Sequence, residues 1–252
     1  MAILVTRPQP DNDSTASALR ARGLDALPAP MLRFEKVVVQ DDHAADAEAH
    51  YGAVIVTSAN ALRGIEGQPI QAALLKLPIY AVGERTAEAA RAIGFAKVIS
   101  ADGDANALRD LVVARVKAKK LKKSATLLYL AGADLARDLA GELGERGFSV
   151  VTHTAYRMAP VLELPATVCE GFAAGKIDAV LHYSRRSARA FFAAARSAGV
   201  EISALAVPHV CLSDSVASIV RDAGATQVLL AATPDENALF AALDRAIGPL
   251  SR

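Results

Sequence analysis

The feature that most constrains the fold of this chain is that its sequence pattern occurs twice. The segment AVIVTSANALRGI (53–65) aligns with AVLHYSRRSARAF (179–191), 126 positions further on. YAVGERTAEAARAIGFAKVI aligns with VCLSDSVASIVRDAGATQVL at an offset of 130, and DANAL aligns with DENAL at an offset of 131. ALRARG and ELGERG, each at the end of a helical pattern, are 124 positions apart. Because four blocks keep their order and spacing, we interpret them as an internal duplication.

Each half alternates short apolar runs with helical patterns. The runs are rich in Val, Ile and Leu, which is typical of strands buried on both faces of a parallel sheet. The helical segments between them end at glycines such as Gly94 and Gly224, a usual helix stop. This alternation predicts an α/β fold with doubly wound parallel sheets. The predicted strands are 3–6, 53–57, 78–82, 97–100, 126–131, 179–183, 209–212 and 227–231.

Two further segments mix polar and apolar residues, as half-buried strands do. They are MLRFEKVVV (31–39) and VTHTAYRM (151–158), at corresponding places in the two halves. We predict that they connect two lobes. Periodicity alone leaves open two contiguous domains that meet near residue 125. The lysine-rich run 117–123 is the other candidate linker, but such a run favours the solvated C-terminal end of a helix.

Composition excludes several classes of partner. The 252 residues carry a formal net charge of +1, so no overall field selects nucleic acid or an anionic membrane. The N-terminus lacks a signal-peptide pattern, and no apolar run approaches the roughly 18 residues of a membrane span. Cys169 and Cys211 lie outside any metal or redox spacing, and we expect buried thiols in a reducing compartment. The composition therefore predicts a cytoplasmic protein without membrane or nucleic-acid partners.

Motifs for common cofactors are missing from the sequence. It contains neither the dinucleotide fingerprint nor the P-loop pattern, and no G-x-S-x-G elbow. The five histidines are scattered without metal-ligand spacing. The segment 233–236 combines a capping box with a proline, which predicts a helix start and little more. We expect a binding cleft that needs neither cofactor nor metal.

Small polar residues follow several of the predicted strands directly. In a parallel sheet these turns gather at the carboxyl ends of the strands, where ligands bind. Each also presents free backbone N–H groups at a helix N-terminus, which suits carboxylate or phosphate. Taken singly, each Ser or Thr is explained as a helix N-cap, whereas their mirrored positions favour a cleft that binds a polyanion. These residues are Ser58, Asn60, Gly83, Thr86, Ser184, Ser187 and Ser213 to Ser215.

At these residues the sequence resembles the uroporphyrinogen-III synthase family. The resemblance covers essentially the whole chain and rests on VTRP, VIVTSANAL, AVGERTAEA, AYRMAP, VLHYSRRSARAF and SDSVASIVRDAG, in this order. It implies two α/β lobes joined by a two-stranded connector. Lobe one would comprise 1–32 plus 160–252, lobe two would comprise 38–152, and the connector strands would be 33–37 and 153–159.

The resemblance also implies the reaction. The family cyclises hydroxymethylbilane, a linear tetrapyrrole with eight carboxylates, with loss of water and inversion of the fourth ring. Such an enzyme mainly has to orient its substrate, and we expect it to do so in a cleft between the lobes, as a monomer. Two other classes stay open: a two-lobed protein that binds a small anion without chemistry, and a nucleotide-sugar or isomerase-type α/β enzyme, which the missing phosphate loop disfavours.

Site residues carry over by position. Tyr156 matches the tyrosine that is the family's usual general-acid candidate, and a half-exposed linker aromatic is its alternative explanation. The resemblance implies that Arg7 is a carboxylate partner. At the late motif the family commonly has Gly and Thr, whereas this chain has Ser213 and Val216. The hydroxyl of the missing Thr would come from Ser215, one position before Val216. The implied substrate-binding set is Thr6, Arg7, Ser58, Asn60, Gly83, Thr86, Ser184, Ser213 and Ser215.

Overall fold

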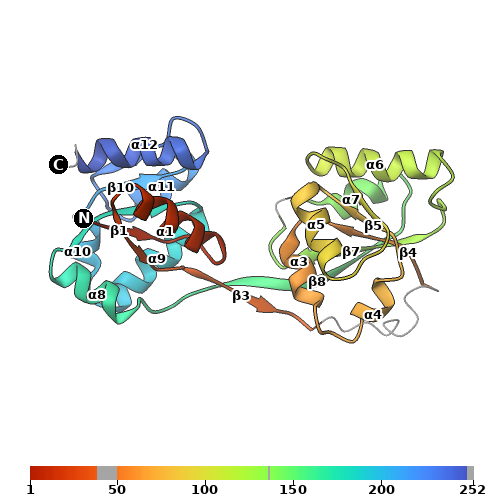
Figure 1. Ribbon diagram of the computed structural model, residues 1–252, viewed down its shortest axis with the longest axis horizontal. Coiled ribbons are helices and arrows are strands. Elements are labelled where there is room, and N and C mark those ends of the chain that lie inside the picture. The colour runs from red at the N-terminus through yellow and green to blue at the C-terminus, as the bar shows by residue number, and fades with distance from the viewer. Residues whose placement is uncertain (39–49, 136, 249–252) are drawn as a thin grey trace. The chain divides into compact units, whose positions relative to one another are not determined.

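The computed structural model describes residues 1–38, 50–135 and 137–248 (Figure 1). The chain divides into two compact units. Lobe one consists of Met1–Phe34 together with Ala159–Arg252, and lobe two of Glu35–Met158. The chain passes from one lobe to the other within two strands, β3 and β8, which are neighbours in one sheet. The division into two contiguous halves is therefore wrong.

Lobe one is a doubly wound α/β unit. Its five strands lie in the order β11-β10-β9-β1-β2, and their pairings are parallel. Alternate residues of β1 face opposite sides of the sheet: Leu4 packs against α8, α9 and α11, and Ile3 packs against α1 and α12. The strands are β1 (Ala2–Val5), β2 (Asp25–Pro28), β9 (Ile177–His182), β10 (His209–Cys211) and β11 (Val228–Leu230). The helices are α1 (Asp11–Ala21), α8 (Ala166–Ala173), α9 (Arg185–Ser197), α10 (Glu201–Leu205), α11 (Asp214–Asp222) and α12 (Glu236–Ile247).

Lobe two repeats this plan. The order of its sheet is β3-β8-β7-β4-β5-β6, with parallel pairings from β8 to β6. The backbone N–H groups of Val37 and Val161 donate to the carbonyls of Ala155 and Met31, which sets β3 antiparallel to β8. The strands are β3 (Leu32–Lys36), β4 (Tyr51–Val56), β5 (Ile79–Ala81), β6 (Val98–Ser100), β7 (Thr126–Gly132) and β8 (Val150–Pro160). The helices are α3 (Ala59–Ile65), α4 (Gln71–Leu74), α5 (Glu84–Ala92), α6 (Ala105–Lys117) and α7 (Leu139–Gly144).

The five strands of lobe one each have a counterpart in the sheet of lobe two, whose sixth strand, β3, has none. The order β11-β10-β9-β1-β2 matches β6-β5-β4-β7-β8 when strands aligned by the sequence repeat are compared. Helix ends correspond as well: Gly94 and Gly224 have φ of +106° and +102°, a conformation that favours glycine. The fold class predicted from the alternating pattern is confirmed, with two sheets dominated by parallel pairings.

Two sequence expectations need correction. Strand β2 was not predicted because it is a short edge strand with an exposed Asp25 and a proline at its end. The lysine-rich run lies inside lobe two, after the end of α6 at Lys117, so it is not the linker between lobes.

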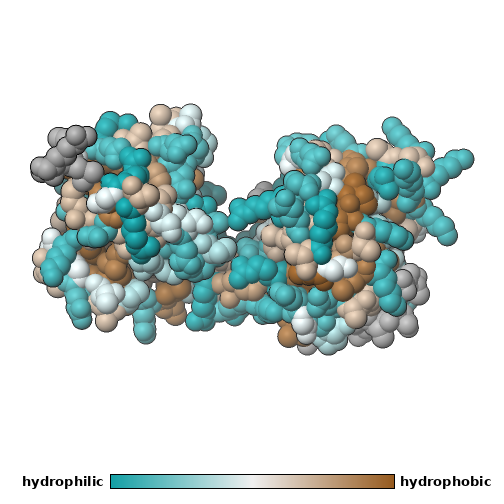
Figure 2. All heavy atoms as spheres, in the orientation of Figure 1, coloured by the Kyte–Doolittle hydropathy of each residue, from teal (hydrophilic) through white to brown (hydrophobic). Residues whose placement is uncertain are grey.

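The visible surface is mostly polar. Figure 2 shows hydrophilic residues spread over this face of both lobes, with apolar side chains in scattered patches. Among the described residues, Ile202, Leu162 and Val38 are the most exposed large apolar side chains. None of the described helices combines the length and apolar character needed to cross a membrane.

Candidate active site

In lobe two, the predicted polar turns share one edge of the sheet. Ser58 is the N-cap of α3, and its hydroxyl accepts a hydrogen bond from the backbone N–H of Asn60 at 3.2 Å. Gly83 is the N-cap of α5, and Thr86 in its first turn is buried. Because these turns follow the neighbouring strands β4 and β5, they lie together at the carboxyl edge of the sheet.

Tyr156 lies at the same edge. It is in β8, and its register partner is Gly132 at the end of β7. A Cβ atom on Gly132 would lie 2.7 Å from the Tyr156 ring, so only glycine lets the ring cover this strand end. The backbone N–H of Ala133 donates to the Tyr156 carbonyl at 2.9 Å. The position of this aromatic ring is therefore fixed by both the backbone and the absence of a side chain beneath it.

A cavity of about 230 Å³ opens beside Tyr156. Within it, the hydroxyl groups of Tyr129 and Thr57 are 3.0 Å apart, a hydrogen bond in which either can donate. Burial raises the pKa of Tyr129. Pockets that hold a whole drug-sized ligand measure roughly 300–1,000 Å³, so this cavity suits one end of a longer molecule. Its lining is Thr57, Ala105, Tyr129, Gly132, Asp134, Leu135, Arg137, Leu139 and Tyr156.

A charged network borders the cavity. Arg137 donates to Glu142 at 2.6 Å and to the Asn106 side-chain oxygen at 2.7 Å, and Arg109 donates to Glu142 at 3.4 Å. The hydrogen bond from Arg137 lowers the pKa of the Glu142 carboxyl. Asp104 caps the N-terminus of α6 through the backbone N–H groups of residues 106 and 107. Arg109 also pairs with Asp110 at 2.9 Å, and Asp134 lines the cavity, so carboxylates match the two guanidinium groups at this edge.

In lobe one, the predicted residues also lie at a carboxyl edge, after β1, β9 and β10. Ser184 is the N-cap of α9 and accepts from the Ser187 N–H at 3.1 Å. Ser213 stands at the N-cap position of α11 without a side-chain capping bond, and its hydroxyl lies 3.1 Å from that of Ser215. Val216 is buried in the core. The position at which this chain departs from the family pattern is thus taken by a packing residue.

Thr6 and Arg7 are both engaged within lobe one. The buried Thr6 hydroxyl donates to the carbonyl of Leu181 at 2.7 Å. Arg7 forms ion pairs with Asp11 at 3.1 Å and Glu236 at 3.2 Å. Its guanidinium carbon also lies 4.7 Å from the centre of the Tyr183 ring. The carboxylate partners of Arg7 in this structure are therefore the protein's own.

Glu236 joins several segments of lobe one, which the sequence did not reveal. Its Oε1 atom accepts hydrogen bonds from Arg7, from the Tyr183 hydroxyl at 2.9 Å and from the Thr15 hydroxyl. Segment 233–236 was predicted to be only a helix start with Pro234 as its first helical residue. This is wrong in detail, because Asp235 is the N-cap and α12 begins at Glu236. We call Arg7, Thr15, Tyr183 and Glu236 the Arg7 cluster.

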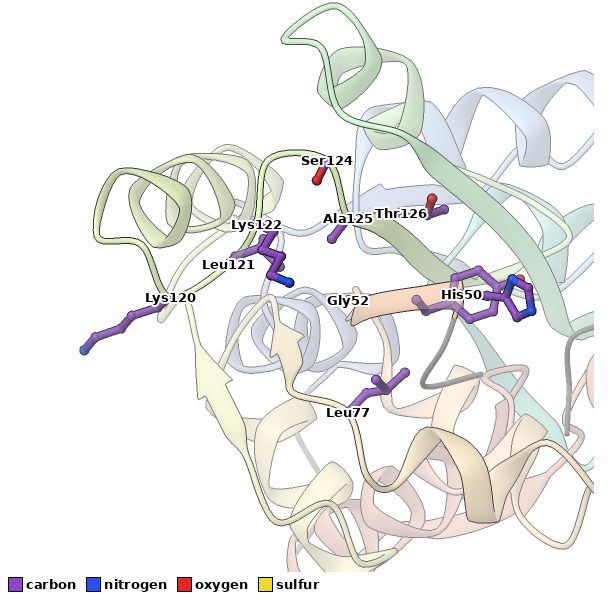
Figure 3. Close-up of a pocket in the computed structure, with 10 residues that line it drawn as sticks. His50, Gly52, Leu77, Lys120, Leu121, Lys122, Ser124, Ala125 and Thr126 are labelled. Atoms are coloured by element: carbon purple, nitrogen blue, oxygen red, sulfur yellow. The ribbon is translucent and has the colours of Figure 1, made fainter. Parts of the chain in front are cut away.

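A larger cavity lies elsewhere in lobe two. It has a volume of about 520 Å³ and is lined by residues that precede or begin β4 and β7, including Gly52 and Thr126 (Figure 3). In Figure 3 the Lys120 side chain points away from the other lining residues. Ligands of open parallel sheets bind at the carboxyl ends of strands, and this cavity is at the amino ends. We therefore place the candidate site at the smaller cavity beside Tyr156.

The described residues hold no group of three or more His, Cys, Asp or Glu side chains that could bind a metal ion. The structure gathers the predicted site residues at two carboxyl edges, one in each lobe. Ser58, Asn60, Gly83, Thr86 and Tyr156 belong to lobe two. Thr6, Arg7, Ser184, Ser213 and Ser215 belong to lobe one.

Fold and site together define a two-lobed α/β protein that presents helix N-termini and polar turns at its strand ends, an arrangement suited to anionic ligands. The uroporphyrinogen-III synthase HemD family model (HEM4) matches residues 13–241. The chain belongs to the uroporphyrinogen-III synthase family, which are cyclising hydro-lyases of tetrapyrrole biosynthesis.

Solved structures agree in fold. Uroporphyrinogen-III synthetase from Helicobacter pylori 26695 is 18% identical with a TM-score of 0.59, over 95% of this chain and 96% of that one. A mutant uroporphyrinogen III synthase from the extremely thermophilic bacterium Thermus thermophilus is 17% identical with a TM-score of 0.53, over 98% of each chain. Comparison with curated protein sequences found no match.

Proposed function

We propose that this chain converts hydroxymethylbilane into uroporphyrinogen III, with loss of water and inversion of the fourth ring. The observation that carries the proposal is the family match over residues 13–241, in a fold that sets Tyr156 beside a cavity at the strand ends of lobe two. Ring closure without inversion needs no enzyme, so the protein must hold the bilane with the correct carbon in reach of the reacting end. Such positioning can lower a barrier by about 7–11 kcal/mol.

The substrate's carboxylates need many hydrogen-bond donors. Helix N-termini supply backbone N–H groups for this purpose without a strongly basic surface, which fits a chain of net charge +1. We propose that the carboxyl edges of both lobes take part, through the turns at Ser58, Gly83, Ser184 and Ser213. In lobe two, Arg137 adds a guanidinium at the cavity wall.

Tyr156 is the proposed general acid. When the terminal C–O bond breaks, the phenol donates its proton to the departing hydroxyl oxygen, and water leaves. General-acid help of this kind is worth about 10²- to 10⁴-fold in rate. The remaining azafulvenium-type cation is then captured by the substituted carbon of the fourth ring, through a spiro intermediate.

The test is an isomer analysis. Freshly generated hydroxymethylbilane is incubated with the folded protein, the products are oxidised, and the porphyrin isomers are separated by chromatography. We expect the type III isomer in excess over a reaction without protein. Formation of only the spontaneous type I isomer would contradict the proposal and favour a protein that binds an anion without chemistry.

Three finer points belong to the same proposal. We infer that the protein acts in the cytoplasm, as a monomer, and that residues 33–37 and 153–159 serve as connector strands between the lobes. Light scattering of the purified protein at several concentrations tests the oligomeric state. A molar mass of about twice 26.3 kDa that persists on dilution would exclude the monomer.

A further inference from the structure

The sequence repeat makes the cavity of lobe two the counterpart of the Arg7 cluster of lobe one. At the repeat offsets of 126 and 131, Thr57 corresponds to Tyr183, and Ala105 corresponds to Glu236. At the offset of 124, Leu139 corresponds to Thr15. All three lobe-two residues line the cavity. The space that hydrogen-bonded side chains fill in one copy is therefore left open in the other.

The open copy contains a second phenol. Tyr129 in the middle of β7 is only 3% exposed and lines the cavity, and its hydroxyl lies 3.0 Å from that of Thr57, the first residue after β4 and also a lining residue. The position of Thr57 is taken in lobe one by Tyr183, whose hydroxyl instead donates to Glu236. The smaller threonine in lobe two thus leaves a cavity at this position and forms a hydrogen bond with one of the phenols that line it.

We propose that Tyr129, held by the Thr57 hydroxyl, is a second proton donor of this cavity, and that the cavity receives the hydroxymethyl-bearing end of the bilane. The inference rests on the proposed function and deepens it. The volume of about 230 Å³ admits one end of the substrate only. The dehydrating end is the part that needs a proton, and the two phenols are the neutral acids of the lining.

The proton that Tyr129 gives to the leaving hydroxyl group is recovered when the ring closes. The Tyr129 proton moves to the hydroxyl oxygen as the C–O bond breaks, the pyrrole nitrogen lone pair supplies the electrons that stabilise the cation, and water departs. The phenolate accepts a hydrogen bond from the Thr57 hydroxyl while the ring closes. Ring closure then releases one proton from a pyrrole carbon, which restores the phenol. The net change is the loss of one water molecule.

Single and double variants test the inference. If either phenol can serve, Tyr129→Phe and Tyr156→Phe should each lower kcat by about tenfold or less. The double variant should lose about 10³-fold, which is more than the product of the two single effects. KM should stay within about twofold in all three, and the remaining product should still be enriched in type III. Tyr80→Phe is the matched control, because Tyr80 is a buried tyrosine outside the cavity lining, and we expect it to keep the wild-type rate.

Two further measurements keep the inference falsifiable. Thr57→Val in the Tyr156→Phe background removes the partner of Tyr129 at nearly constant volume and should lower kcat about threefold or more. A double variant as active as Tyr156→Phe alone, or single effects that simply multiply, would overturn the inference. If either of these results is found while the wild-type protein makes the type III isomer, only the inference about Tyr129 is wrong and the proposed function stands. If the wild-type protein makes only the type I isomer, the inference and the proposed function are both wrong.

Discussion

The two lobes differ at one equivalent place at the carboxyl ends of their strands. We call this place the corner: it holds the Arg7 cluster in lobe one and the cavity beside Tyr156 in lobe two. In lobe one, Glu236 gathers Arg7, Tyr183 and Thr15 on a single oxygen atom and fills the corner. In lobe two, the corresponding residues are small or apolar, and a cavity remains. The comparison teaches that polar contacts occupy this place in lobe one and hold β1, β9, α1 and α12 together. In lobe two the cavity beside Tyr156 occupies the equivalent place.

The interiors differ as well. His182 and His209 are fully buried in lobe one, where corresponding positions of lobe two hold Val56 and Ile79. The Nε2 of His209 donates to the Ala204 carbonyl at 3.0 Å, so its Nδ1 accepts from the Nε2 of His182 at 2.9 Å. In this pattern the His209 ring is neutral, and burial disfavours the charged form of both rings. The Nδ1 of His182 is buried with no hydrogen-bond partner among the described residues.

The largest expected effect is the selective loss of lobe one in acid. Burial lowers the pKa of His209 to about 4, and burial together with His209 lowers the pKa of His182 well below 6.5. Above pH 6.5 both imidazole rings are neutral in the folded and in the unfolded protein. Below it the unfolded chain binds protons that the folded lobe does not, so stability falls between pH 6.5 and about 4. A shift from 6.5 to about 4 makes His209 alone cost roughly 3 kcal/mol at the acid end.

The matched control for the acid effect comes from lobe two. Paired replacement His182→Val with His209→Ile copies its residues and should remove this part of the pH dependence. Urea denaturation of the wild type and the double variant at pH 7.5, 6, 5 and 4 measures the free energy of unfolding at each pH. Equal acid sensitivity of the wild type and the double variant would show that other groups dominate.

The second effect is obtained by closing the open corner. Ala105→Glu copies Glu236 at the first position of α6, where a helix N-terminus tolerates an acidic residue. The added side chain should fill the cavity and lower kcat/KM about 100-fold, because misplacement of a substrate by about 1 Å has this cost. Ala105→Gln separates filling from charge and should retain most of the loss. Unchanged kinetics of both folded variants would mean that the cavity holds no part of the substrate.

The third effect is obtained by opening the closed corner. Glu236→Ala copies lobe two and leaves Arg7, Tyr183 and Thr15 without their shared acceptor. The expected loss is about 1–3 kcal/mol in the free energy of unfolding of lobe one. Glu236→Gln keeps an acceptor oxygen and should lose less. Urea denaturation of both variants at pH 7.5 provides the measurement, and an alanine variant as stable as the wild type would show that the cluster contributes no net stability.

The smallest effect concerns Tyr156 alone. Because positioning is spread over many backbone groups, no single side chain should be indispensable. Tyr156→Phe keeps the ring above Gly132 and removes the phenol, so turnover should fall about tenfold while the isomer preference stays. Initial rates measure the turnover, and product chromatography measures the isomer preference. Complete inactivity of the folded variant would contradict the prediction that no single side chain is indispensable.

Much of this arrangement could be predicted from the sequence, and the reasons are physical. Continuous apolar runs such as 53–56 are buried on both sheet faces, and capping residues such as Ser58 and Ser184 stand shortly after strands. Local patterns encode both facts. The repeat also implied which strands correspond.

What the sequence could not predict are contacts between distant segments. Glu236 looked like the first turn of a helix, yet its partners Arg7 and Thr15 are more than 200 positions away. Tyr129 was predicted only as part of a buried strand. The one signal that distinguished it is that it is the single aromatic residue of TLLYLA. Its meeting with Thr57 depends on the register of β7 against β4, which no local pattern reveals.

The interruption of lobe one by lobe two bears on how the chain acquires its structure during synthesis. Strand β1 is central in its sheet and pairs with β9 in the register Leu4 to Val180. Its other neighbour, β2, follows soon after it in the sequence, whereas β9 is synthesised more than 170 residues later. Lobe two is continuous in sequence and can complete its core in the meantime. Until then the edge of β1 that pairs with β9 has no partner strand, and we expect the β1–β2 pair to need protection from aggregation during this interval.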